Sequence, residues 1–151
     1  MSYKGLSVLV FSIAIFFIAC NSDPEPISLE GDYGVTILDI SNCNDSTENR
    51  FFSIDSNFCF LDTFVGFERC LTTAELTFTD DTYQFDKVLD ENGVITEDVE
   101  MGTYSRVDNN NFVFCNPVCD TVFVVLDGQI INIVMSDTLI GCGTLIRAIR
   151  N

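Results

Sequence analysis

The chain of 151 residues contains no histidine, the side chain that most often serves as a general base. The Ser/His/Asp and Cys/His nucleophile systems are excluded with it. No glycine-rich phosphate loop follows an expected strand. Adjacent carboxylates such as Asp80/Asp81 and Glu97/Asp98 are expected by chance among 23 acidic residues, whereas a glycosidase needs two carboxyls at a defined separation across one cleft. We therefore expect a protein that is not an enzyme and that carries no cofactor.

Positive charge is scarce as well. Seven lysines and arginines stand against 23 acidic residues, which gives a formal net charge of −16. A surface this acidic repels nucleic acid and anionic lipid headgroups, so we expect no nucleic-acid partner and no basic membrane-binding face. Solubility and mutual repulsion at a crowded surface explain the charge more simply than a dedicated cationic partner does.

The N-terminus has the form of a secretory signal. Lys4 precedes an almost wholly apolar run from Leu6 to Ile18, which has the length of a signal and is too short to span a bilayer. The run closes with Phe17-Ile18-Ala19-Cys20, which resembles the lipobox of bacterial lipoproteins. In that family the cysteine becomes the acylated N-terminus. The alternative is an ordinary signal peptide with a cysteine near its end by chance.

The lipoprotein resemblance implies a division of the chain into three parts. Residues 1–19 are the signal, residues 20–28 an acidic tether, and residues 29–151 a single domain. Removal of the signal leaves 132 residues and, because Lys4 is lost, a net charge of −17. The resemblance implies an exported outer-membrane lipoprotein, at the cell surface or facing the periplasm. Its membrane attachment would come from acyl chains on Cys20.

The cysteine count fits this division. Of seven cysteines, assigning Cys20 to lipid leaves six, which are Cys43, Cys59, Cys70, Cys115, Cys119 and Cys142. Six cysteines in an exported domain suggest three disulfides. Metal binding is the alternative, but there is no histidine and no second close cysteine pair, so we expect no metal. Six cysteines allow 15 pairings, and only Cys115 with Cys119, around Pro117, suggests itself sterically.

The clearest strand signals lie in residues 74–86. Apolar and polar residues alternate on both sides of Asp80-Asp81, and a two-residue loop there places Phe78 opposite Tyr83 and Leu76 opposite Phe85 on the buried side. Residues 121–135 form a second hairpin, for which we expect the loop Asp127-Gly128. Both faces of that hairpin are apolar, which predicts that it is covered on both sides.

The pattern in the rest of the domain predicts further short strands. We expect an opening strand over Val35–Ile40, one or two short disulfide-pinned strands within residues 51–70, and a final strand over Thr138–Ile149 bent near Gly141. No long helical pattern appears after residue 28, and turns recur at the intervals of a meander. The prediction is an all-β domain of about eight antiparallel strands in a barrel or strongly curved sheet.

The order of the motifs resembles the lipocalin-like lipoproteins of Bacteroidetes-type bacteria. The matching residues are Leu29-Glu30-Gly31-Asp32-Tyr33, Cys70, Leu76-Thr77-Phe78, Asp80-Asp81-Thr82-Tyr83, Gly102-Thr103-Tyr104 and Ile146-Arg147. Tyr33 and Tyr104 stand where that family carries tryptophan. The resemblance implies a lipocalin-like barrel in which Tyr33 packs on Arg147 or Arg150.

Aromatic side chains could line a cavity for one small apolar ligand. The candidates are Phe78, Tyr83, Phe85, Tyr104, Phe112 and Phe114. The alternative is that they fill the barrel and leave no cavity. We accordingly expect a protein that binds a small apolar molecule or another envelope protein, or else a structural accessory of the envelope without such a ligand.

Calcium is the remaining candidate metal. Asp90, Asn92 and residues 108–110 could contribute oxygen ligands to an irregular site, although the EF-hand pattern fails because Val88 and Glu91 occupy key positions. Solvated turns are the simpler interpretation.

Overall fold

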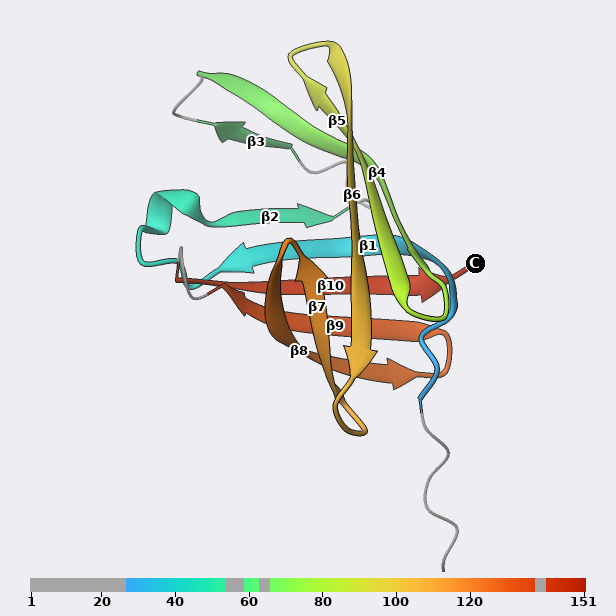
Figure 1. Ribbon diagram of the computed structural model, residues 1–151. Helices are drawn as coiled ribbons and strands as arrows, with labels where there is room; N and C mark the ends of the chain where they lie inside the picture. The colour runs from blue at the N-terminus through green and yellow to red at the C-terminus, as the bar shows by residue number, and fades with distance from the viewer. Residues whose placement is uncertain (1–26, 54–58, 63–65, 138–140) are drawn as a thin grey trace, which may run out of the picture.

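The computed structural model describes residues 27–53, 59–62, 66–137 and 141–151, and their strands join in one antiparallel sheet (Figure 1). The elements are β1 (Gly31–Ser41), η2 (Ser46–Glu48), β2 (Arg50–Ser53), β3 (Cys59–Asp62), β4 (Phe67–Phe78), β5 (Thr82–Glu91), β6 (Val94–Arg106), β7 (Asn111–Asn116), β8 (Val118–Asp127), β9 (Ile130–Asp137) and β10 (Cys142–Arg150). Within these ranges no helix is both long enough and apolar enough to cross a membrane.

Eight of the strands close into a barrel. From β4 to β10 each strand pairs with the next along the chain, and β1 pairs with β10 on one edge and with β4 on the other. The closing pair runs from Gly31 opposite Phe78 to Gly34 opposite Glu75. The predicted fold class is confirmed as an all-β, eight-stranded antiparallel meander barrel, an architecture compatible with a lipocalin-like fold.

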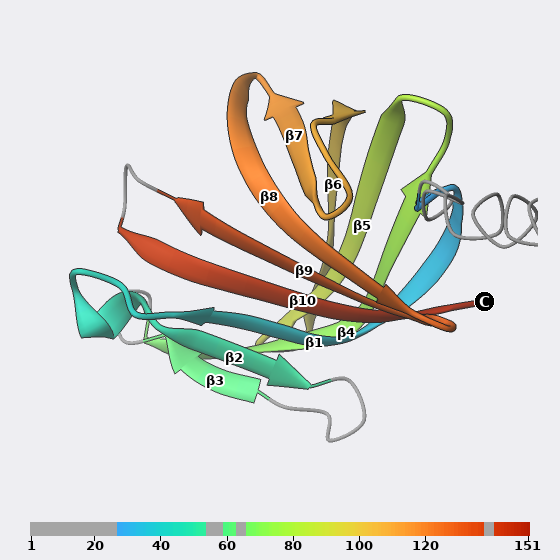
Figure 2. The same ribbon diagram turned by 90° about the horizontal axis from the view of Figure 1, so that it is seen from below.

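The other two strands lie where β1 and β4 separate. The second half of β1, from Ile37 to Ile40, pairs with β2, and the first half of β4 pairs with β3. Figure 2 shows β2 and β3 next to each other beside the barrel. The expectation of one or two short strands within residues 51–70 is therefore confirmed by β2 and β3, of which only β3 is pinned by a disulfide, and β4 begins in the same range.

Three disulfides staple the barrel, as predicted. Cys43–Cys142 joins the loop after β1 to the start of β10, Cys59–Cys70 joins β3 to β4, and Cys115–Cys119 spans the β7–β8 hairpin around Pro117. The last two bridges link residues that lie directly opposite each other on paired strands. The final strand begins at Cys142, whereas residues 138–140, where we expected it to begin, lie outside the described residues.

The β4–β5 hairpin has the predicted register. Phe78 lies opposite Tyr83 and Leu76 opposite Phe85, and Thr79 N donates a 2.9 Å hydrogen bond to Thr82 O across the Asp80-Asp81 loop. The alternation of apolar and polar side chains decides this register, because a slip by one residue would turn the apolar set toward solvent.

The β8–β9 loop differs from the prediction by one residue. Asp127 pairs with Ile130, so the loop is Gly128-Gln129, and Gly128 has φ 61°. A turn with positive φ only at its first central residue needs glycine there and accepts glutamine next. The pairing moves by two residues, an even number, so every side chain keeps its predicted face.

The outer face of this hairpin is exposed, and the prediction that both faces are covered is wrong. Val122, Val124, Ile131 and Ile133 point into the barrel and are at most 1% exposed. The outward side chains are Phe123 (46% exposed), Val125 (38%), Ile130 (38%) and Val134 (45%). A closed barrel is a single layer with one interior, and no other described element packs over this outer face.

Candidate functional site

One end of the barrel is filled by aromatic rings. Phe78 lies at the centre, with its ring centroid 6.0 Å from Tyr33, 5.3 Å from Tyr104 and 5.9 Å from Phe114, in edge-to-face geometry. Phe112 packs on Tyr104 at 6.2 Å. Such pairs contribute about 0.5–1.5 kcal/mol each beyond the area they bury. Phe78, Tyr104 and Phe112 therefore belong to this cluster and do not line the cavity described next.

Beyond the cluster the barrel encloses a cavity of about 300 Å³. Its apolar wall is made of inward side chains from seven strands, namely Leu38, Ile40, Leu76, Tyr83, Phe85, Phe114, Val122, Ile133, Met135 and Ile146. Three of the six predicted lining residues, Tyr83, Phe85 and Phe114, are among them. The volume is at the lower end of the range for small-molecule sites.

A polar wall completes the cavity, formed by Lys87, Glu100, Asn116, Asp120 and Thr144 with Val118. Lys87 follows Phe85 by two positions on β5, so the pleat points both side chains to the same face. Phe85 lies opposite Glu100 and Lys87 lies opposite Asp98 on β6, which brings both carboxylates to that face.

Lys87 is held by these neighbours. Its side chain is 15% exposed, and its Nζ lies 2.9 Å from Asp98 Oδ2, donates to Glu100 Oε1 and sits 5.0 Å from the centre of the Phe85 ring. Sequence reasoning missed Lys87 and Glu100. The signal was present, because Lys87 continues the inward alternation of Tyr83 and Phe85.

Burial and neighbouring carboxylates shift the pKa values of three side chains in and next to the cavity. Burial disfavours the charge of Lys87, but its hydrogen bonds to Glu100 and Asp98 outweigh burial and raise the pKa of Lys87 above 10.5. Burial and, after it, the charge of Glu100 raise the pKa of Tyr83 above 10.0. In the aromatic cluster, burial followed by repulsion from Glu30 and Asp80 raises the pKa of Tyr104. These contacts thus favour the protonated form of Lys87, which is paired with Glu100 and Asp98.

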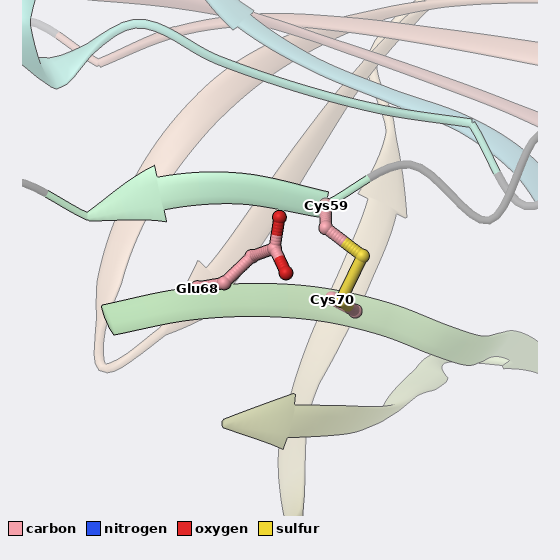
Figure 3. Close-up of side chains that lie close together, drawn as sticks. All are labelled: Cys59, Glu68 and Cys70. Atoms are coloured by element: carbon pink, nitrogen blue, oxygen red, sulfur yellow. A yellow bond between two sulfur atoms is a disulfide. The ribbon is translucent and has the colours of Figure 1, made fainter. Parts of the chain in front are cut away.

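One group of side chains has the spacing of metal ligands. Ligand atoms of Cys59, Glu68 and Cys70 lie within 4.8 Å of one another. Figure 3 shows the two sulfurs bonded to each other beside the Glu68 carboxylate. Disulfide sulfurs are not thiolates, so Glu68 is the one anionic ligand that this group offers.

The residues considered for calcium are not brought together. Asp90 and Asn92 lie at the β5–β6 hairpin, and Asp90 Oδ1 accepts a 2.7 Å hydrogen bond from Gly93 N. Asp108 lies at the opposite end of β6, thirteen residues long, where its carboxylate accepts from the backbone N–H groups of Asn110 and Asn111. The side-chain amide of Asn111, which also donates to this carboxylate, and after it the two backbone N–H groups lower the pKa of Asp108. Each carboxylate caps its own turn.

The lipidation candidate Cys20 and most of the tether lie outside the described residues. The described chain begins at Ile27, and Leu29, at the start of the expected domain, is buried in the core.

No protein-family model, no curated protein and no solved structure matches the chain.

Proposed function

We propose that the protein is a cell-envelope lipoprotein that binds one small apolar molecule inside its barrel. The observation that carries this proposal is the cavity of about 300 Å³, walled on most sides by aliphatic and aromatic side chains. Apolar walls of this kind favour a ligand by about 0.8 kcal/mol for each methylene group removed from water. The proposed role is binding, because among the ionisable groups that line the cavity Lys87 is held by two carboxylates and burial favours the neutral form of the Tyr83 phenol by raising its pKa. The remaining lining carboxylate, Asp120, is a charged group that a ligand can meet.

Calorimetric titration with octanol, a neutral amphiphile, tests the cavity. Thr144 and Leu145 are neighbours on β10, but Thr144 lines the cavity whereas Leu145 lies opposite Val134 on the outer face. Thr144→Phe fills the cavity and should abolish octanol binding, while Leu145→Phe adds similar bulk outside and should leave it intact. Equal binding by both variants, or none by the wild type, would overturn the proposal.

The membrane attachment is tested separately at Cys20. The lipobox resemblance of residues 17–20 supports acylation of this cysteine and hence an outer-membrane location. Labelling cells with radioactive palmitate should mark the wild-type protein and not the Cys20→Ala variant. Label that persists in the variant would contradict the lipoprotein assignment without bearing on the cavity.

A second candidate function is a structural or assembly accessory of the envelope, with a protein partner in place of a ligand. The exposed apolar face of β8 and β9 favours it, because contiguous apolar patches mark interaction sites. Phe123→Ser combined with Val134→Thr should then abolish a cross-linked product formed in intact envelopes, with octanol binding retained. A product that survives these substitutions would exclude this face as the contact.

A further inference from the structure

The charges that line the cavity are unbalanced. Two carboxylates, Glu100 and Asp120, face it against one ammonium, Lys87. Asp120 shares the inward face because it lies opposite Phe114 across the β7–β8 pair. Asp98 does not line the cavity, but it pairs with Lys87 at 2.9 Å and adds a third carboxylate next to that ammonium.

The single ammonium is already neutralised. Lys87 contacts Asp98 and Glu100 together, so a carboxylate ligand would compete with two resident carboxylates for it. Asp120 is exposed at the cavity and has no ion-pair partner among the residues that the structure describes. The other described lysine and arginine side chains do not line the cavity. Arg147, for example, donates a hydrogen bond to Asn132 on the outer face.

The cavity therefore disfavours a second negative charge. Tyr83 fits this, since burial and, after it, the charge of Glu100 oppose formation of its phenolate and raise its pKa. An added negative charge is repelled by Glu100 and Asp120, and this interaction is several-fold stronger near a protein surface than in bulk water. A cationic head group is attracted by the same two carboxylates.

We propose that the cavity selects amphiphiles with a positively charged head group, such as alkylamines, over carboxylates of the same chain length. The apolar wall holds the chain, and the ammonium lies at the polar wall formed by Glu100 and Asp120. This inference rests on the proposed function, because it names the ligand class of the same site.

Three probes with the same chain, octylamine, octanol and octanoate, separate the two proposals in calorimetric titrations at neutral pH. We expect octylamine to bind at least about tenfold more tightly than octanoate, with octanol between them, and the ratio to shrink as salt rises. Octanoate binding as tightly as octylamine would overturn the inference and leave the apolar site standing. Failure of all three probes would overturn the proposed function itself.

Charge-neutral variants locate the selectivity. Glu100→Gln and Asp120→Asn should each reduce the preference for octylamine several-fold, and together they should remove it. Glu97→Gln is the matched control, because Glu97 lies on the same strand opposite Val88 and is exposed on the outer face. An equal loss of preference in Glu97→Gln would show that the net charge of the whole protein, and not the cavity, selects the amine, and would overturn the inference.

Discussion

Arg150 Nη2 donates a 2.6 Å hydrogen bond to the hydroxyl of Tyr33, and the guanidinium carbon lies 5.1 Å from the centre of the Tyr33 ring. The same nitrogen donates to Glu30 O at 2.8 Å, and the Tyr33 hydroxyl donates to Leu29 O at 3.0 Å. This contact ties the last strand to the first where the barrel closes. The resemblance left open whether Arg147 or Arg150 packs on Tyr33. Arg150 makes this contact, whereas Arg147 points outward.

Tyr33→Phe should destabilise the protein by about 1–3 kcal/mol, since it removes one buried and one partly buried hydrogen bond and leaves Leu29 O without its donor. The free energy of unfolding from urea denaturation measures this. Arg147→Gln is the control. Arg147 lies on β10, the strand of Arg150, but on its outer face, and the substitution should change stability by under about 0.5 kcal/mol. Equal losses in the two variants would mean that the contact does not close the barrel.

The three disulfides should differ in their contribution according to the loop each one closes. Their sequence separations are 99 for Cys43–Cys142, 11 for Cys59–Cys70 and 4 for Cys115–Cys119. Chain-entropy arithmetic gives about 4.7, 2.8 and 2 kcal/mol respectively. Paired Cys→Ala substitutions, measured one bridge at a time by urea unfolding, should reproduce this order. A smaller loss for Cys43–Cys142 than for Cys115–Cys119 would contradict it.

Gly102 is required by the close approach of its neighbours. A Cβ built there would lie 2.3 Å from Cys115 O and 2.6 Å from Tyr83 Cε1. Gly102→Ala should therefore cost about 1–3 kcal/mol or more, because backbone on β7 must move. Gly143→Ala is the control, with its nearest atom, Ser41 O, at 3.5 Å, and should be close to neutral. Thermal unfolding compares the two variants.

Stability should fall at alkaline pH. The folded-state pKa values of Lys87, Tyr83 and Tyr104 are raised above 10.5, 10.0 and 10.0, so each group contributes stability that is present below those values and lost as pH rises through its folded pKa. Urea midpoints measured from neutral pH to above pH 10.5 should show the decline. Tyr83→Phe with Tyr104→Phe removes two of the three contributions and should flatten it, whereas an unchanged slope would contradict the assignment.

Local pattern predicted the hairpins well. The register of β4 on β5 followed from alternation, which excludes pairings shifted by one residue, together with the two-residue loop Asp80-Asp81. The β8–β9 loop was displaced by one residue because Asp-Gly and Gly-Gln are both acceptable two-residue turns. The apolar outer face of the same hairpin was misjudged because alternation shows which residues share a face and not what covers it.

The candidate site was predicted less completely. The aromatic residues were all expected inside, but whether a given ring lines a cavity or fills the core depends on packing against strands distant in sequence. Phe78 and Phe114 illustrate this, since they contact each other and yet only Phe114 reaches the cavity. Lys87 was missed because its neutralisation by Asp98 and Glu100 depends on the β5–β6 register.

The sequence by itself determined the all-β class, the register of the β4–β5 hairpin and the presence of three disulfides, because these follow from residue alternation, turn chemistry and the cysteine count. The tertiary structure decided which cysteines pair, that β1 closes on both β10 and β4, and that Arg150 meets Tyr33. It also decided that carboxylates surround a single ammonium at the cavity. Pairings over such sequence distances depend on how the whole sheet curves and closes, and no local pattern encodes that geometry.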